Sequence, residues 1–406
     1  MTIKRISATV FFYLIACAGW FMLGTTTQLR STNMSSRLGS EVRVLWGAPL
    51  VQCAPEFVVQ IPGTEQTRNI MPSASAIDTD IALEYRKKGL IWYPTYRCRF
   101  GGTYTLTNEE EVAQKVLLHF AFPVPGGTYD GFSFSMDDEK LVVPVDTEEG
   151  IREIIELPPG ISRDIRITYA TRGLHDWRYR IDPGTGRVQN LKLTVTTDFL
   201  NIDYPEDSLS PSEAQPSEKG MTITWEAEDL ITGQALGVVV PAKLNPGPLS
   251  SRITFFAPVC LLFFFVLLAT VNIVWKVNIH PMHYLFTAAG FFAFHLLFAY
   301  LLDHINVHAA FALAAVTSVV MVTMYLAAAL GKHFPWKIVA TGQLFYLVLF
   351  SYSFFLKGMT GLTVTVGAVL TLGVLMKVTA GTDWEKVFAK KTEETLPEPT
   401  ALPAEG

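Results

Sequence analysis

The stretch from Ile253 to Met376 constrains the fold more than any other part of the chain. Its formal charges lie only at the boundaries between five long apolar runs, and they are Lys276, Asp303, Lys332, Lys337 and Lys357. Each run is about 18–23 residues long, which lets a helix cross a hydrocarbon core roughly 30 Å thick. A stretch of this kind cannot be the core of a water-soluble domain. The sequence therefore predicts an integral membrane protein with a bundle of five transmembrane helices.

A sixth apolar run, Ile6 to Leu23, opens the chain, and a long polar region separates it from the other five. We expect four parts: an N-terminal transmembrane anchor over residues 1–27, a β-rich periplasmic domain over 28–251, a five-helix transmembrane domain over 252–378 and a disordered cytoplasmic tail over 379–406. The segment Leu14-Ile15-Ala16-Cys17 also resembles a lipoprotein cleavage box. The chain stays apolar after Cys17, which favours an uncleaved anchor, with cleavage at Cys17 as the alternative.

Lysine and arginine in the short loops predict the orientation of the helices. Lys4 and Arg5 precede the first run, and further basic residues fall at alternate boundaries and in the tail, namely Lys276, Lys332, Lys337, Lys377, Lys386, Lys390 and Lys391. The opposite side has only Arg30, Arg252 and Lys357. This bias predicts that both termini lie in the cytoplasm and that the large polar domain lies outside it.

The polar region is rich in strand patterns separated by Pro and Gly turns. Segments such as Val42–Trp46, Val116–Phe122 and Leu191–Thr196 are β-branched or alternate with period two. We predict an all-β, sandwich-like extracytoplasmic domain inserted between the first helix and the bundle of five. Ala74–Lys88 is the one place where a short helix is expected.

Charge and cysteine content limit the partners of this domain. Residues 28–251 carry 30 acidic and 21 basic side chains, a net charge of −9. We therefore expect no nucleic-acid partner, since phosphate binding requires a basic face. The lipid bilayer and an unidentified envelope component or protein on the periplasmic side are the expected partners. Cys53 and Cys98 could form a disulfide outside the cytoplasm, or they could remain two buried thiols.

The sequence contains no hydrolase elbow, phosphate loop, metal pair or Cys–His arrangement. His119 lies on a strand pattern and His175 beside Asp176, and a structural role is favoured over catalysis for both. We expect no catalytic residue, no metal and no cofactor, and hence a protein that is not an enzyme.

Within the predicted bundle, His295 is the one titratable group near the middle of a run, and it shares a helix face with Tyr284, eleven residues earlier. Ionisable groups inside a membrane often mark a transport pathway. A neutral imidazole hydrogen-bonded between helices is the favoured reading, and a proton or ligand site is the alternative.

The other candidate positions lie at the helix ends. His280 and His283 form an i,i+3 pair that could share a metal, and Pro281 suits the first turn of a helix that begins there. Asp303 and His304 lie at the opposite end, roughly 34 Å away along a helix, so the two groups cannot form one site. Gly367 and Gly373 in the last run predict a tightly packed final helix that is not exposed to lipid.

Several segments resemble the CreD family of bacterial inner-membrane proteins. The resemblance rests on residues 257–265, on His280-Pro281-Met282-His283-Tyr284, on residues 291–297 and 300–304, and more loosely on 46–50 and 88–96. It implies one helix, an outer domain and a terminal helix bundle. It also implies a link to cell-envelope integrity and colicin tolerance, with no catalytic residue to carry over.

Two functions remain open. In the first, which we favour, a non-enzymatic protein presents a β-domain that binds or senses an envelope component. In the second, the bundle is a transporter or channel with its site around His295 and Tyr284.

Overall fold

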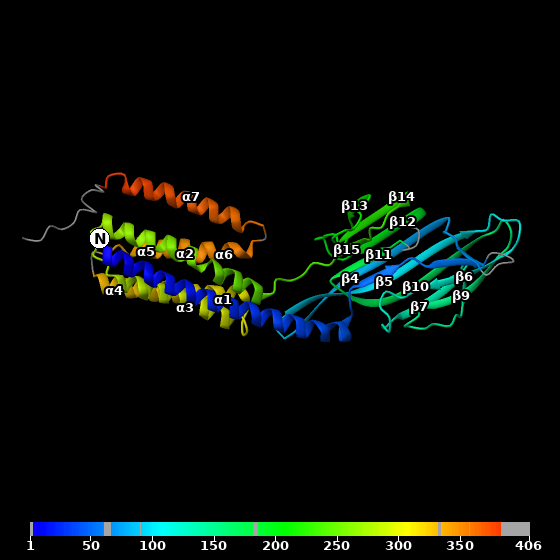
Figure 1. Ribbon diagram of the computed structural model, residues 1–406, viewed down its shortest axis with the longest axis horizontal. Coiled ribbons are helices and arrows are strands. Elements are labelled where there is room, and N and C mark those ends of the chain that lie inside the picture. The colour runs from blue at the N-terminus through cyan, green and yellow to red at the C-terminus, as the bar shows by residue number, and fades with distance from the viewer. Residues whose placement is uncertain are drawn as a thin grey trace, which may run out of the picture. The chain divides into compact units, whose positions relative to one another are not determined.

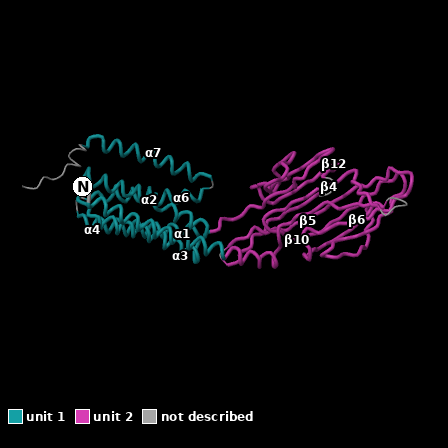
Figure 2. The backbone as a smooth tube through the Cα atoms, viewed as in Figure 1, with its two compact units in different colours: residues 1–33, 246–406 teal, residues 34–245 magenta. Residues whose placement is uncertain are grey.

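The computed structural model describes residues 3–60, 66–89, 91–181, 186–331, 334–356 and 358–382. These form two compact units, one of residues 1–33 with 246–406 and the other of residues 34–245 (Figure 2). Helix α1 (Ile3–Trp46) contributes to both units. The expected tail lies outside the described residues from position 383 onward.

Among the described residues, six helical segments are long and apolar enough to cross a membrane, as the sequence predicts. Four of them are continuous helices after α1 (Figure 1): α2 (Pro246–Val274), α3 (Pro281–Leu301), α4 (Val307–Leu330) and α7 (Thr360–Thr379). The remaining span, Trp336–Phe355, changes its helical pitch along its length. It consists of α5 (Trp336–Gln343), the π-helical η1 (Leu344–Leu349), α6 (Phe350–Tyr352) and the 3₁₀-helical η2 (Ser353–Phe355).

The helices of the bundle pack through aromatic side chains and small residues. Phe264 of α2 meets Phe291 of α3 with ring centroids 4.9 Å apart. At Gly290 of α3 a Cβ would lie 2.3 Å from Cγ2 of Val322 on α4, so only glycine permits this approach. Without a hydrophobic driving force between helices in lipid, such close van der Waals contact is a main source of bundle stability.

The prediction of a tightly packed final helix is wrong for most of α7. Gly367 and Thr371 are its buried residues, and a Cβ at Gly367 would lie 2.4 Å from the ring of Phe350. A Cβ at Gly373 would meet no atom within 4 Å, and most other side chains of α7 are exposed. Small residues permit close packing but do not by themselves produce it.

Helix α1 extends well beyond the predicted anchor. The segment Val42–Trp46, expected as a strand, is its last turn. Its 44 residues correspond to roughly 66 Å, about twice the thickness of a hydrocarbon core. The polar second half of this helix therefore belongs to the region outside the apolar span.

The second unit is built of strands in three sheets. The largest has the order β13-β14-β12-β4-β5-β10-β7-β8, the second β3-β2-β6-β9 and the third β1-β11-β15. The strands of the largest sheet are β4 (Ala74–Lys88), β5 (Ile91–Thr107), β7 (Asp130–Met136), β8 (Glu139–Leu141), β10 (Ser162–Leu174), β12 (Arg187–Thr197), β13 (Glu213–Pro216) and β14 (Met221–Ile231). The others are β1 (Leu50–Cys53), β2 (Glu56–Gln60), β3 (Thr67–Asn69), β6 (Gln114–Phe120), β9 (Ile151–Leu157), β11 (Asp176–Arg180) and β15 (Leu236–Val239).

All three sheets contribute to one hydrophobic core, which includes Phe57 of β2, Tyr104 of β5 and Trp177 of β11. The described part of residues 50–245 is built of strands and loops, in agreement with the predicted β-domain. The sheets are not purely antiparallel, because β4 pairs in parallel with β12, and β1 with β11. These parallel pairs join segments that are far apart in the sequence.

The short helix expected at Ala74–Lys88 is not formed, since this segment is the fifteen-residue strand β4. Its first half buries every second residue, among them Ile77, Thr79 and Ile81. This period-two burial is what a strand between β5 and β12 requires. The charged second half, which resembles an exposed helix in sequence, continues the ladder with β5 as far as Lys88.

The close approach at Gly290 leads to a stability prediction. We expect Gly290→Ala to lower the free energy of unfolding by about 1–3 kcal/mol, because the added methyl group overpacks the contact with Val322. The matched control is Gly373→Ala, where the new Cβ meets nothing. Unfolding of the protein in mild detergent with increasing dodecyl sulfate measures both. Equal stability of the two variants would contradict the close α3–α4 contact.

Candidate functional site

The predicted site residues at the start of α3 act in helix capping and packing. Nδ1 of His280, the N-cap residue, accepts the backbone N–H of Met282 at 3.3 Å, and Pro281 occupies the first turn. His283 instead lies 2.9 Å from the hydroxyl of Tyr325 on α4, through its Nδ1. The two imidazoles thus have separate partners. In the described residues no group of three or more His, Cys, Asp or Glu side chains could hold a metal ion.

At the other end of α3, Asp303 pairs with Arg30 of α1, with Nη2 and Oδ2 2.6 Å apart. Both side chains are partly exposed, and exposed pairs contribute little net stability. The backbone N–H of His304 donates to the carbonyl of Leu301 in the turn that ends the helix. Asp303 therefore lies where α1 meets the end of α3. The residues next to Arg30 and Asp303 in the sequence do not indicate this pairing.

His295 is fully buried and contacts α1. The Nε1–H of Trp20, also fully buried, lies 3.2 Å from Nδ1 of His295. The same nitrogen lies 2.9 Å from the carbonyl oxygen of Phe291. One ring nitrogen cannot accept from Trp20 and donate to Phe291 at the same time. In either tautomer Nε2 of His295 has no hydrogen-bond partner among the described residues.

Tyr284 lies on the same helix but in a different environment. Its ring packs edge-to-face against Phe265 of α2 with centroids 5.0 Å apart, and its buried hydroxyl has no partner within the described part of the chain. Eleven residues of helix separate it from His295, an axial rise of roughly 16 Å. The two side chains therefore share a face of α3 without touching a common small ligand.

The bundle contains two linked, buried hydrogen bonds that the sequence did not predict. The hydroxyl of Ser318 on α4 donates to the carbonyl of Gly290 at 2.8 Å and accepts the side-chain amide of Gln343 at 3.1 Å. Gln343 is fully buried and immediately precedes the π-helical segment η1. Its sequence signal is that it is the only amide side chain in the apolar span 336–355.

The structure contains no disulfide between Cys53 and Cys98, the pairing that the even number of cysteines in the β-domain allows. Cys98 is fully buried on β5 in the largest sheet, whereas Cys53 is half-buried at the end of β1 in a different sheet. Burial raises the pKa of the Cys98 thiol far above its ordinary value, which makes it unreactive at neutral pH.

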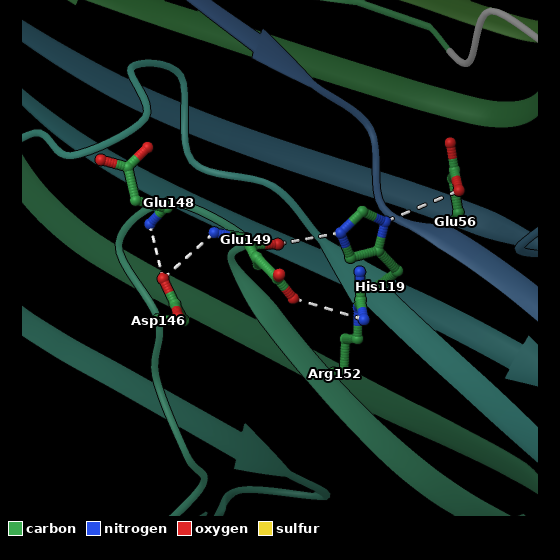
Figure 3. Close-up of polar contacts among 6 residues, drawn as sticks. All are labelled: Glu56, His119, Asp146, Glu148, Glu149 and Arg152. Carbon is green, nitrogen blue, oxygen red and sulfur yellow. Dashed lines mark hydrogen bonds and ion pairs between the residues drawn. The ribbon is translucent and has the colours of Figure 1, made fainter.

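His119 on β6 lies at a turn-anchoring cluster (Figure 3). Its Nε2 is 3.0 Å from the carbonyl oxygen of Glu149, and its Nδ1 is 3.7 Å from the carboxylate of Glu56. The carboxylate of Asp146 accepts the backbone N–H groups of Glu148 and Glu149, which together hold its pKa below the ordinary range. These contacts fix the turn before β9, in agreement with the structural role expected for His119.

The β-domain contains an open cleft of about 920 Å³. It is lined by residues 43–48 at the end of α1, 97–99 on β5, 124–130 before and at the start of β7, and 170–172 on β10. Four of these are Arg43, Arg97, Arg99 and Arg172, and we call this hollow the arginine cleft. The alternation Arg97-Cys98-Arg99 on a strand is its sequence signal, because it places both guanidinium groups on the face opposite the buried thiol.

Hydrogen bonds fix one wall of the arginine cleft, and a close backbone approach fixes the other. The hydroxyl of Tyr129 donates to the carbonyl of Val124 at 2.7 Å and accepts its N–H at 3.0 Å, which closes the loop. Burial raises the pKa of this phenol to about 12. Thr171 of β10 donates to the carbonyl of Thr128 at 2.8 Å. On the opposite wall Gly47, with φ +117°, approaches β10 so closely that a Cβ would lie 2.4 Å from the carbonyl oxygen of Arg172.

Residues 211–385 match the family described as inner membrane protein CreD, which confirms the family resemblance over this part of the chain. The match covers the end of the β-domain and the bundle. No curated protein matches the chain.

Three solved structures that match the chain resemble it only remotely. One is a candidate nutrient-binding protein from Legionella pneumophila, with 11% identity over 65% of this chain and 98% of that one, at a TM-score of 0.31. Another is an M1 zinc metallopeptidase from Deinococcus radiodurans, with 11% identity over 78% and 92% of the chains, at 0.26. A two-domain M1 zinc metallopeptidase gives 10% identity over 43% and 44%, at 0.25. At these TM-scores none of the likenesses supports an inference.

The contact between Trp20 and His295 leads to a double-mutant prediction. We expect His295→Leu to lower the free energy of unfolding by about 1–3 kcal/mol, since it leaves the buried Trp20 N–H without an acceptor. Combining it with Trp20→Phe should cost less than the sum of the single changes, by about 1 kcal/mol. Tyr284→Phe is the control, because it removes a buried hydroxyl that has no partner and should leave stability unchanged or raised. Strict additivity in the detergent unfolding assay would contradict the hydrogen bond.

Proposed function

Since residues 211–385 match the family of inner membrane protein CreD, we propose that this protein anchors a periplasmic β-domain that binds or senses an envelope component. It contributes to envelope integrity or to stress and colicin tolerance as a binding protein and is not an enzyme. The observation that carries this proposal is the arginine cleft, a concave site of about 920 Å³ in the β-domain. That volume lies within the usual range of small-molecule sites, roughly 300–1,000 Å³.

The polar groups of the bundle support an anchoring role. Two of its buried polar side chains, Ser318 and Gln343, hydrogen-bond to each other, and Ser318 also donates to the backbone of Gly290. The ion pair of Arg30 with Asp303 and the contact of Trp20 with His295 both join α1 to α3. Such contacts hold the N-terminal helix to the bundle, which a protein presenting an outer domain requires.

A second candidate function is transport or conduction through the bundle. It is supported by Nε2 of His295, a buried polar atom without a partner among the described residues. An intramembrane ionisable residue is a functional-site hypothesis by default. This function requires that His295→Ala and His295→Leu both abolish flux in liposomes, and retained flux in either variant would exclude His295 as its centre.

The proposed orientation is tested by cysteine labelling in a Cys53→Ser background. We expect Val142→Cys, whose side chain is fully exposed on the β-domain, to react with a membrane-impermeant maleimide in spheroplasts. Lys337→Cys, exposed at the start of α5, should react only after lysis, because the Lys and Arg bias predicts a cytoplasmic position for it. The reverse labelling pattern would overturn the periplasmic assignment.

Ligand binding by the arginine cleft is tested by photo-crosslinking in native membranes. A photoreactive phenylalanine in place of Val44, which is 86% exposed in the cleft wall, should capture a discrete envelope component. The same probe at Val142, which is also exposed on the β-domain but outside the cleft, is the matched control. Identical products from the two positions, or none from Val44, would contradict a binding function for the cleft.

A further inference from the structure

The floor of the arginine cleft brings three guanidinium groups onto one face of the sheet. Arg97 and Arg99 are two residues apart on β5, so their side chains leave the same face. Arg172 of β10 is the direct register partner of Arg97. Directly opposed residues in an antiparallel pair have Cβ atoms only about 4.5–5.5 Å apart. Arg97 and Arg172 therefore place two positive charges side by side.

Arg97 and Arg172, the two directly opposed arginines, form no ion pair within the described part of the domain. Seven other arginines form ion pairs with carboxylates, namely Arg30, Arg68, Arg86, Arg152, Arg163, Arg178 and Arg187. Arg97, Arg99 and Arg172 make no such pair and no side-chain hydrogen bond with described residues. Across β4, Arg99 faces Asp80, but Arg97 faces Ala82, so Arg97 has an arginine on one side and an alanine on the other.

The surrounding charge makes this arrangement unusual. Residues 28–251 carry a net charge of −9, yet the arginine cleft contains four arginines and one acidic residue, Asp130. One carboxylate oxygen of Asp130 accepts the N–H of Gly131 at 2.9 Å. Like charges directly opposite in a sheet are destabilising. A bound anion between Arg97 and Arg172 removes that repulsion.

We propose that the arginine cleft binds a phosphorylated ligand, with a phosphate group between Arg97 and Arg172 and within reach of Arg99. This rests on the function proposed above, because it names the ligand class for the same cleft. A guanidinium is planar and donates in a fork to phosphate or carboxylate. One carboxylate is matched by one such fork, whereas the several terminal oxygens and greater charge of a phosphate suit two or three arginines.

The size and lining of the cleft indicate that the phosphate is part of a larger molecule. The cleft of about 920 Å³ is far larger than a phosphate ion, and its walls also carry Leu45, Trp46 and Val124. Such a mixture suits a phosphate attached to an organic group with apolar surface. A soluble phosphate ester and the headgroup of a membrane lipid share this chemistry.

The test uses the full chain in nanodiscs of uncharged, zwitterionic lipid, with binding measured by calorimetry. Inorganic pyrophosphate and monomeric dihexanoyl phosphatidic acid, a lipid with a terminal phosphate, are the two probes, and citrate is the carboxylate comparison. We expect at least one phosphate probe to bind more tightly than citrate, with affinity that falls as salt rises. Tighter binding of the lipid probe identifies a headgroup site, and tighter binding of pyrophosphate identifies a soluble phosphate ligand.

The variant Arg97→Gln/Arg172→Gln should weaken phosphate binding at least about 100-fold, since it removes two charge-assisted contacts. Arg166→Gln is the matched control, because Arg166 is an exposed arginine of β10 outside the cleft lining. The affinity of this variant for the phosphate probe should stay within about twofold of that of the unmodified protein. The melting temperature of the double variant without ligand should be unchanged or higher, since the like-charge pair is gone. If that variant does not fold, Arg97→Lys/Arg172→Lys keeps the charge, loses the forked geometry and should still weaken binding.

Failure of both phosphate probes to bind, binding equal in the double variant, or tighter binding of citrate would overturn the phosphate assignment. Crosslinking from Val44 separates this failure from that of the function proposed above. If the probe at Val44 still captures a component in the presence of pyrophosphate, the cleft binds a ligand that is not a phosphate, and only the phosphate assignment fails. Loss of both capture and phosphate binding overturns both proposals.

Discussion

The exclusion of charge from the apolar helices is the constraint on which the rest of this structure depends. In hydrocarbon every backbone polar group must be bonded within the protein, so the spans are helices. Charged side chains are then restricted to positions outside the apolar spans, where Arg30 meets Asp303. Inside the bundle, the packing of the helices is determined by contacts between uncharged groups, such as Gly290 against Val322 and the Ser318–Gln343 hydrogen bond.

In the β-domain charged side chains are not restricted in this way, because strand positions that face water can carry them. Its alternation buries Cys98 and Phe100 in the core and directs Arg97 and Arg99 to the other face. The pairing of β5 with β10 then opposes Arg97 to Arg172. The arginine cleft is therefore a positively charged site in a domain of net negative charge, and we propose that it recognises an anion.

Residue patterns predict the helices of this protein better than its sheets. The apolar runs give all six spans, since length and hydropathy are local properties. Ala74–Lys88 is a strand despite its helix-compatible charged end, because its pairing with β5 and β12 outweighs local propensity. The exposure of most of α7 likewise depends on which helices contact it. His295 illustrates the same limit: the sequence gives its depth in the span, but not its contact with Trp20, 275 residues earlier in the chain.

Residue patterns alone establish the apolar spans, the β-rich nature of the polar domain and the lack of recognisable catalytic motifs. These follow from hydropathy, strand periodicity and residue spacing, which need no knowledge of long-range contacts. Long-range contacts are needed to establish that Cys53 and Cys98 lie in different sheets without a disulfide, and that four arginines line one cleft. The physical reason is register: which residue of β10 opposes Arg97 is set by the pairing of strands more than 70 residues apart, and the net charge of the domain does not reveal it.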